Sequence, residues 1–509
     1  MPKVDELEIA ARVDGILNRR PSVGLAVGVV RDGCLEFFQG YGLADIASNT
    51  PVTEDTVFRI ASITKTFTAI AIMQLCEQGL LDLDAPANDY LRAYQLVPAK
   101  DSWRPATARH LLTHTAGIAE QVPRFGMLRP DFGESVKVGQ RMPSLAEYYR
   151  GALRLDAEPG TRFRYGDHSP ATLGQIVEDV TGEPLQSYLR EHVLQPLGMT
   201  NSTLVRSEVD HSSLATGYKL RSRGADPVPD RDAVMIGAGA AYSTPRDMAR
   251  YLAALMGAGA NEHGLVLKPA TVASMFAAQY QPDPRIPGIG LAFWRHNACG
   301  HPVVEHQGLL PGFDSQIVVA PDDGVGVMAF TNGTRGGAAW IPTEMSRLLN
   351  HLLGVPDEAI RTNVPQRPQV WGDLCGWYYL PGPLTDVRLR AMLGAGVEVF
   401  VRRGQLLVRI LSPIPAFYKG FPLHPDDETD PYAFRIDFSE FGFGTFPVVF
   451  SRAPETGTTA VHFGLMPLTA QKRPPATNPR LWVEGAVALG TAAVLGRRLR
   501  TTRRPHRTT

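Results

Sequence analysis

FRIASITKTFTAIAIMQLCEQG, from Phe58 to Gly79, is a mostly apolar stretch that begins with a serine and a lysine. Its length and composition predict a buried helix, and Gly79 is a typical left-handed C-terminal cap. Ser62 and Lys65 are three residues apart, so a helix places them on the same face. They are either a cap and a surface charge or a nucleophile and its base.

The chemical interpretation of this pair makes specific demands on Lys65. An alcohol such as that of Ser62 is a poor nucleophile at neutral pH and needs a neighbouring base. A lysine serves as that base only if its pKa falls from ~10.4, through burial or nearby positive charge. The N–H groups at the helix start would face a developing oxyanion. Ser-x-x-Lys is common by chance, so the motif alone favours a structural role.

Two later stretches carry polar residues at the ends of regular elements. In FRYGDHSPATLGQIVEDVTG, Tyr165 and Asp167 precede a run with the 3.6-residue period of a helix. In VVEHQGLLPGFDSQ, His306 ends a β-like run just before Gly308. Taken singly, packing or capping explains each of them.

Taken together and in this order, the three stretches resemble the β-lactamase-like serine hydrolases. This broad family contains class C β-lactamases, D-alanyl-D-alanine carboxypeptidases, D-aminopeptidases and related esterases. Its site combines Ser-x-x-Lys, Tyr-x-Asn, and Lys-Thr-Gly or His-x-Gly on an edge strand, and Ser62-Ile63-Thr64-Lys65 matches the first. RHLLTHTAGI and GAGAAYSTPRDMARYL also look like the family, and the resemblance covers roughly residues 8 to 350.

The resemblance implies a role for each matching side chain. Ser62 would attack a carbonyl and become acylated, while Lys65 and Tyr165 would share the proton transfer. His306 would bind the hydroxyl network or a substrate carboxylate, as the family's lysine or histidine does.

The resemblance also implies an oxyanion hole, and the sequence departs from the family beside it. The backbone N–H groups of Ser62 and of Leu309, just after Gly308, would form the hole. The family's asparagine is replaced by Asp167, whose carboxylate cannot donate a hydrogen bond and favours a charged Lys65. That moves the base role partly onto Tyr165, makes recognition of β-lactams or D-Ala-D-Ala amides less favoured, and predicts that Asp167→Asn lowers the pH required for the basic form.

The expected fold is α/β (α+β): a β-lactamase/transpeptidase-like antiparallel sheet flanked by helices with an all-α lobe, followed by an all-β module. We assign residues 1–355 to the catalytic domain and 356–370 to a proline-spaced linker. Short alternating strands predict a β-barrel or sandwich-like domain over 371–475, and 476–509 would form a hydrophobic helix and a basic tail. Within the catalytic domain, strand-like runs cover Gly288 to His296 and two later segments.

Composition and spacing argue against several other functions. The formal net charge is zero, so no global field favours nucleic acid. Four scattered cysteines without a CxxC spacing do not form a disulfide scaffold. His110 and His114 are four residues apart, but the glutamate of an HExxH zinc motif is missing. We therefore expect no metal, no cofactor and a small-molecule ester, amide or lactam substrate; the oligomeric state stays open.

The two ends of the chain bear on location. The N-terminus lacks the apolar core of a signal peptide, so we expect a cytoplasmic protein. Leu481 to Gly496 is apolar and precedes an arginine-rich tail, but it is shorter than the ~20 residues that span a bilayer. Membrane anchoring through this segment is the alternative.

The function expected from the sequence is hydrolysis of a carboxylic ester or small amide through a Ser62 acyl-enzyme. The first alternative is a D-stereospecific peptidase, a penicillin-binding carboxypeptidase or a β-lactamase. An alternative of another class is a non-catalytic scaffold with the same fold, in which Asp167 marks a degraded site.

Overall fold

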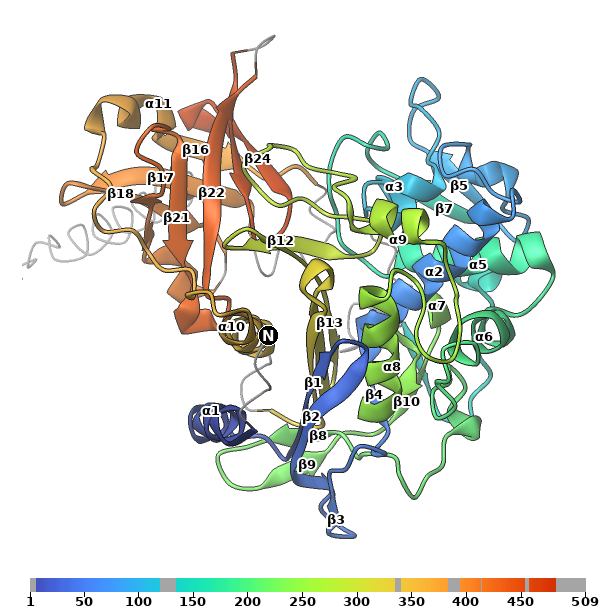
Figure 1. Cartoon of the computed structure of the whole chain (residues 1–509). Coiled ribbons are helices and arrows are strands. Elements are labelled where there is room, and N and C mark those ends of the chain that lie inside the picture. The colour runs from blue at the N-terminus through green and yellow to red at the C-terminus, as the bar shows by residue number, and fades with distance from the viewer. Residues whose placement is uncertain are drawn as a thin grey trace, which may run out of the picture. The chain divides into compact units, whose positions relative to one another are not determined.

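The structure, a computed structural model, describes residues 6–119, 134–334, 340–382, 394–412, 414–453 and 457–481. The chain divides into two compact units (Figure 1). The first comprises Met1–Ala359, Asp437–Phe446 and Gly464–Leu468, and the second comprises Ile360–Ile436, Pro447–Phe463 and Thr469–Thr509. Each unit therefore draws on separate stretches of the sequence.

The first unit is built on a seven-stranded sheet with the order β12-β13-β14-β15-β1-β2-β3, in which every neighbouring pair is antiparallel. Its strands are β1 (Gly24–Arg31), β2 (Cys34–Asp45), β3 (Thr50–Pro51), β12 (Trp294–Ala298), β13 (His301–Leu310), β14 (Phe313–Ala320) and β15 (Val325–Thr331). Four two-stranded ladders pair β4 (Phe58–Arg59) with β11 (Tyr242–Ser243), β5 (Gln95–Pro98) with β7 (Ala152–Leu155), β6 (Ser135–Lys137) with β10 (Arg231–Ala233), and β8 (Tyr218–Leu220) with β9 (Ala225–Pro227).

The helices of this unit cover both faces of the sheet. They are α1 (Glu6–Arg19), α2 (Thr64–Glu77), α3 (Ala108–Leu112), α4 (Leu145–Tyr149), α5 (His168–Thr181), α6 (Leu185–Leu189), α7 (Ile236–Gly239), α8 (Pro245–Met256), α9 (Pro269–Phe276) and α10 (Trp340–Leu353). Figure 1 shows α1 and α10 on one face and α8 with α2 on the other. The apolar faces of α1 and α10 pack into a core with alternate residues of β1, β14 and β15. The antiparallel sheet flanked by helices is confirmed.

Local turn chemistry explains how the N-terminal hairpin joins the later strands. Asp32 and Gly33 connect β1 to β2 with φ values of 49° and 82°, the two positive angles of a type I′ turn. β1 then pairs with β15 from Leu25 opposite Thr331 to Arg31 opposite Val325. The N-terminal hairpin and the strands from the end of the domain thereby form one continuous sheet.

The second unit contains most of the predicted C-terminal β module, and the first unit holds the short stretches Asp437–Phe446 and Gly464–Leu468. A nine-stranded sheet has the order β19-β18-β17-β16-β24-β23-β22-β21-β20. The short helix α11 (Trp371–Leu374) precedes this sheet. The strands of the sheet are β16 (Gly376–Tyr379), β17 (Gly396–Arg402), β18 (Gln405–Ile410), β19 (Phe421–Pro422), β20 (His424–Pro425), β21 (Ala433–Asp437), β22 (Thr445–Arg452), β23 (Thr459–Phe463) and β24 (Leu468–Arg473). Of the apolar segment from Leu481 to Gly496, all but Leu481 lies outside the described residues. Among the helices that are described, none has both the length and the apolar character needed to cross a bilayer.

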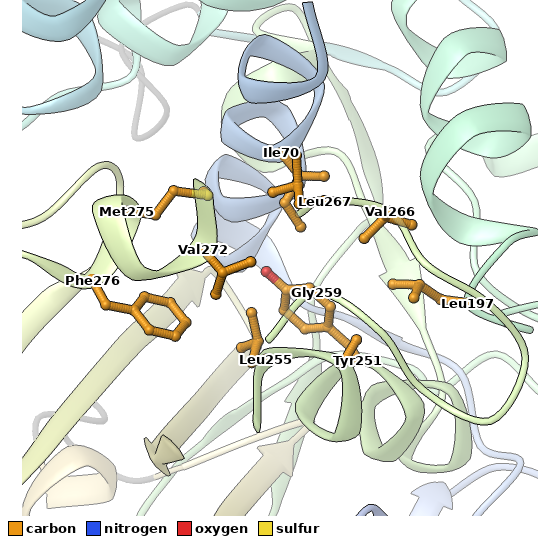
Figure 2. A pocket seen from close by; sticks show the side chains of 11 residues that line it. Ile70, Leu197, Tyr251, Leu255, Gly259, Val266, Leu267, Val272, Met275 and Phe276 are labelled. Atoms are coloured by element: carbon orange, nitrogen blue, oxygen red, sulfur yellow. The ribbon is translucent and has the colours of Figure 1, made fainter. Parts of the chain in front are cut away.

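Helix α2 lies inside the first unit with buried residues on all of its sides, from Thr64 to Leu75. A small apolar cavity remains beside it, between Ile70, Tyr251 and Val272 (Figure 2). Its volume is about 10 Å³, at the lower limit for a single water molecule, so it cannot hold a substrate. The cavity is therefore a packing defect of the core beside α2.

The carboxyl group of Asp314 on β14 predicts a measurable pH dependence of stability. Asp314 is buried, and its contact with the Thr334 hydroxyl is long, at 3.4 Å. Burial raises the pKa of Asp314 to about 7. The folded state therefore keeps a proton that the unfolded chain has already lost above pH 4, so the contribution of Asp314 to stability falls as the pH rises from about 4 to 7. The full cost is on the order of 4 kcal/mol.

We expect Asp314→Asn to remove most of this loss, because the amide cannot ionise. The measurement is the urea midpoint of unfolding at pH 5 and pH 8, compared between variant and wild type. Asp322→Asn, an exposed aspartate in the turn after β14, is the control and should keep the wild-type difference. Equal pH dependence in the wild type and in Asp314→Asn would contradict the assignment.

Candidate active site

Ser62 lies in a tight turn, Ala61–Ile63, that leads into α2. Ala61 has a φ of 50°, a left-handed conformation that is costly for a residue other than glycine and must be held in place. Two hydrogen bonds of the preceding residue, Ile60, hold this turn in place. Ile60 N–H donates to Ala241 O at 3.0 Å, and Ser315 Oγ donates to Ile60 O at 2.9 Å. Strand β14 and the segment before β11 thus fix the position of Ser62.

Lys65 is the centre of the site, and its side chain is only 1% exposed. Its Nζ atom donates to Ser62 Oγ at 2.8 Å, to Asp167 Oδ1 at 2.7 Å and to Ala238 O at 2.8 Å. An ammonium group has three protons, so these three acceptors satisfy it completely. The amine therefore joins the starts of α2 and α5 to the short helix α7.

The charge state of Lys65 follows from its surroundings. Burial alone would lower its pKa, but the negative charge of Asp167 and the contact with Tyr165 outweigh burial and raise it. Asp167 occupies the N-cap position of α5, yet its side chain caps no helix N–H group and instead reaches Lys65. The expectation that this carboxylate favours a charged lysine agrees with the geometry.

Tyr165 lies within a group of aromatic rings beside the ammonium. Lys65 Nζ is 5.2 Å from the centre of the Tyr165 ring. The ring of His114 is 4.6 Å from that of Tyr165, and the ring of Trp294 is 5.7 Å away. Phe163 contacts both His114 and Trp294, at 6.0 and 5.6 Å. Tyr165 therefore has little freedom to leave the amine.

His306 is buried on β13, and its tautomer can be assigned. Nδ1 lies 2.7 Å from Gln307 O, and because a carbonyl only accepts, Nδ1 carries the proton and Nε2 is the acceptor. Burial, followed by the positive charge of Lys65, lowers the pKa of His306 to about 3. The imidazole is therefore neutral at physiological pH.

Among the described residues, β13 continues past the point where β12 ends, and this part of it lies against the Ser62 turn. Strand β12 pairs with β13 only as far as Trp294 opposite Glu305. In an antiparallel ladder the N–H groups alternate in direction, and Leu309 lies in the same phase as Glu305, facing the side where β12 has ended. The Leu309 N–H is thus available for a ligand. A methyl group on Gly308 would lie 2.1 Å from Ile60 O, so only glycine allows this edge to approach the Ser62 turn.

Most of the residues singled out in the sequence are brought together. Ser62, Lys65 and Asp167 are joined by hydrogen bonds, Tyr165 lies beside the ammonium, and His306 is near enough for the charge of Lys65 to act on it. Three further contributors were not identified as site residues: His114, Trp294 and the carbonyl of Ala238. His114 and Ala238 fall in the two auxiliary stretches that resemble the family, which was the available signal.

His110 and His114, the two histidines considered as metal ligands, each contact another side chain. His110 Nδ1 is 3.1 Å from Thr107 Oγ1 at the start of α3, and His114 packs against Tyr165. Elsewhere in the described chain, Glu183, Glu191 and His192 have ligand atoms within 4.8 Å of one another, but all three are exposed.

Comparison of the chain with known proteins identifies its family. The family model named Beta-lactamase matches residues 9–350. The esterase EstB of Burkholderia gladioli is 32% identical over 240 residues, which cover 45% of this chain and 61% of that esterase. A β-lactamase of Yersinia enterocolitica is 28% identical, covering 65% of this chain and 88% of that protein.

A solved structure supports the fold over most of the chain. The octameric penicillin-binding protein homologue from Pyrococcus abyssi superposes with a TM-score of 0.60 at 23% identity, covering 92% of this chain and all of that one. With the family match spanning more than half of the sequence, the chain belongs to the Beta-lactamase family of serine hydrolases.

Proposed function

We propose that this protein hydrolyses neutral carboxylic esters through an acyl-enzyme on Ser62. The observation that carries the proposal is the position of Lys65 Nζ, which bridges Ser62 Oγ at 2.8 Å and Asp167 Oδ1 at 2.7 Å inside the protein. A surface charge or a simple helix cap would not bury an ammonium against a hydroxyl.

In the first step the Ser62 oxygen bonds to the ester carbonyl carbon, and its proton passes to the coupled Lys65 and Tyr165 pair. The form of the pair that accepts this proton is the one that has already lost a proton. Because Asp167 favours the charged form of Lys65, Tyr165 takes the larger part of this role. The C–O bond to the alcohol then breaks, and the alcohol leaves with that proton. A water molecule repeats the sequence on the acyl-enzyme and releases the acid.

The negative charge that develops on the carbonyl oxygen needs donors. The N–H of Ser62 and the N–H of Leu309 on the free edge of β13 supply them in this proposal. One donor of this kind contributes ~3 kcal/mol to lowering the barrier. Its position depends on Gly308, which lets the strand lie against Ile60.

The charges around Ser62 favour a neutral substrate. After burial, the positive charge of Lys65 is the next cause that lowers the pKa values of His114 and His306. This charge is already paired with Asp167. His306 is neutral, so it cannot attract a substrate carboxylate as a cation would. The Asp167 carboxylate, with 30% of its side chain exposed, would repel one. β-Lactams and D-Ala-D-Ala peptides carry such a carboxylate, whereas simple esters do not.

Replacing the nucleophile gives the first test. Ser62→Ala should abolish both labelling by a fluorophosphonate and turnover of p-nitrophenyl esters, because no oxygen remains to be acylated. Wild-type protein should cleave p-nitrophenyl esters faster than nitrocefin, and faster than it releases D-alanine from a D-Ala-D-Ala peptide. Activity is read by absorbance and labelling by in-gel fluorescence.

Ser202→Ala, a serine that hydrogen-bonds Ser243 and Asp247 away from Lys65, is the matched control and should keep wild-type labelling. Faster hydrolysis of nitrocefin or of the D-Ala-D-Ala peptide would replace the ester proposal with the β-lactamase or carboxypeptidase alternative. Wild-type protein that reacts with none of these reagents would favour the non-catalytic scaffold.

Removing the carboxylate next to Lys65 should shift the pH dependence of kcat/KM. Asp167 favours the protonated form of Lys65, so Asp167→Asn lets the amine lose its proton at lower pH. The ascending limb of the profile should therefore move to lower pH. Asp226→Asn, which removes an exposed partner of Arg221, should leave the profile in place. An unchanged profile in Asp167→Asn would contradict the coupling.

A methyl group at Gly308 tests the oxyanion edge. In Gly308→Ala the new carbon would lie 2.1 Å from Ile60 O and 2.2 Å from Ser315 Oγ, so β13 must move away from Ser62. Because displacements near 1 Å cost ~10²-fold in rate, we expect kcat to fall by at least that factor. Gly15→Ala on α1 adds the same group with no atom nearer than 3.5 Å and should leave kcat unchanged. Wild-type kcat in Gly308→Ala would exclude this role for the edge.

A further inference from the structure

His114 is a buried residue whose backbone adopts an unusual conformation beside the site. It follows α3, its φ is 56°, and it is 4% exposed. Histidine and asparagine tolerate left-handed backbone better than most residues, which explains why the chain can turn sharply here. The turn directs the imidazole towards Tyr165.

The backbone around His114 is joined to the segment that carries Tyr165. Arg164 N–H donates to His114 O at 2.8 Å, one residue before Tyr165. Further along the same two segments, Gly160 N–H donates to Thr115 O at 2.8 Å, and Asp156 N–H donates to Gly117 O at 2.9 Å. These bonds fix the loop up to the residue before Tyr165, but not the orientation of the tyrosine side chain.

The ring of His114 does contact that side chain. Its centroid lies 4.6 Å from the centroid of Tyr165, with 45° between the planes, close to the spacing of a favourable aromatic pair. Its Nδ1 is buried and has no hydrogen-bond partner among the described residues. Burial, with the charge of Lys65, lowers the pKa of His114 to about 3, so the ring is neutral. Its contribution here is therefore contact between rings and not hydrogen bonding.

We propose that His114 is a positioning residue whose imidazole packs on Tyr165 and holds that ring beside the Lys65 ammonium. The inference rests on the proposed function, since Tyr165 must be placed only if it shares the proton of Ser62. Its two contributions, the left-handed turn and the ring, can be separated by substitution. Asparagine keeps the tolerance for a positive φ and loses the ring, whereas phenylalanine keeps an aromatic ring and loses the nitrogens.

The test compares the rate at which a fluorophosphonate phosphonylates Ser62, a reaction in which Ser62 Oγ bonds to phosphorus, the P–F bond breaks, and fluoride leaves with the serine proton. We expect His114→Asn to lower the maximal labelling rate constant by 10- to 100-fold at an unchanged half-saturating concentration. His114→Phe should stay within about 5-fold of wild type, because the ring contact is retained. Urea midpoints of both variants are measured alongside.

A second histidine–tyrosine pair provides the matched control. His192 lies 4.4 Å from Tyr188 with 41° between the rings, nearly the same geometry away from the site. His192→Asn should label at the wild-type rate.

Equal labelling of wild type and His114→Asn would overturn the inference, and so would a slow His114→Phe with a wild-type urea midpoint. If His114→Asn does not fold, the phenylalanine variant decides. Wild-type protein that is not labelled at all would overturn the proposed function, and this inference with it.

Discussion

The buried ammonium of Lys65 is the interaction on which the rest of the site depends. A charge that is 1% exposed is stable only when every donor is satisfied, and here the acceptors come from the Ser62 turn, the start of α5 and the carbonyl of Ala238 in α7. These elements are far apart in sequence, so satisfying one amine fixes their relative positions. The same bonds that avoid an unpaired charge also place the serine hydroxyl.

The features predicted well from the sequence are those set by local chemistry. Asp32 and Gly33 form the hairpin turn because both adopt positive φ, and Gly79 ends α2 with a φ of 73°. The residues expected to carry the chemistry, including Ser62, Lys65 and Asp167, do meet in space. Their side chains have distinctive chemistry, so a pattern of residue types was sufficient to find them.

The features that escaped prediction arise from backbone and tertiary contacts. A strand was expected from Gly288, but β12 begins only at Trp294. Gly288 and Ala292 have left-handed backbones, and a side chain on Gly290 would lie 2.2 Å from Met275 O, so this segment packs against α9 instead of extending. The carbonyl of Ala238 has no sequence signature at all, because every residue has one. His114 was considered only as a metal ligand. Its contact with the Tyr165 ring joins distant parts of the sequence, and no local pattern indicates it.

Burial, and not the absence of basic residues, determines the electrostatic character of the site. His114 and His306 would both be potential cations on the surface, yet enclosure beside Lys65 keeps them neutral. The remaining charges, Lys65 and Asp167, lie 2.7 Å apart and largely cancel at a distance. The Lys65–Asp167 pair therefore presents no net positive charge to an approaching molecule. The proposed preference for neutral substrates then rests on the carboxylate of Asp167, at the place where the motif of the family that the sequence resembles has an asparagine.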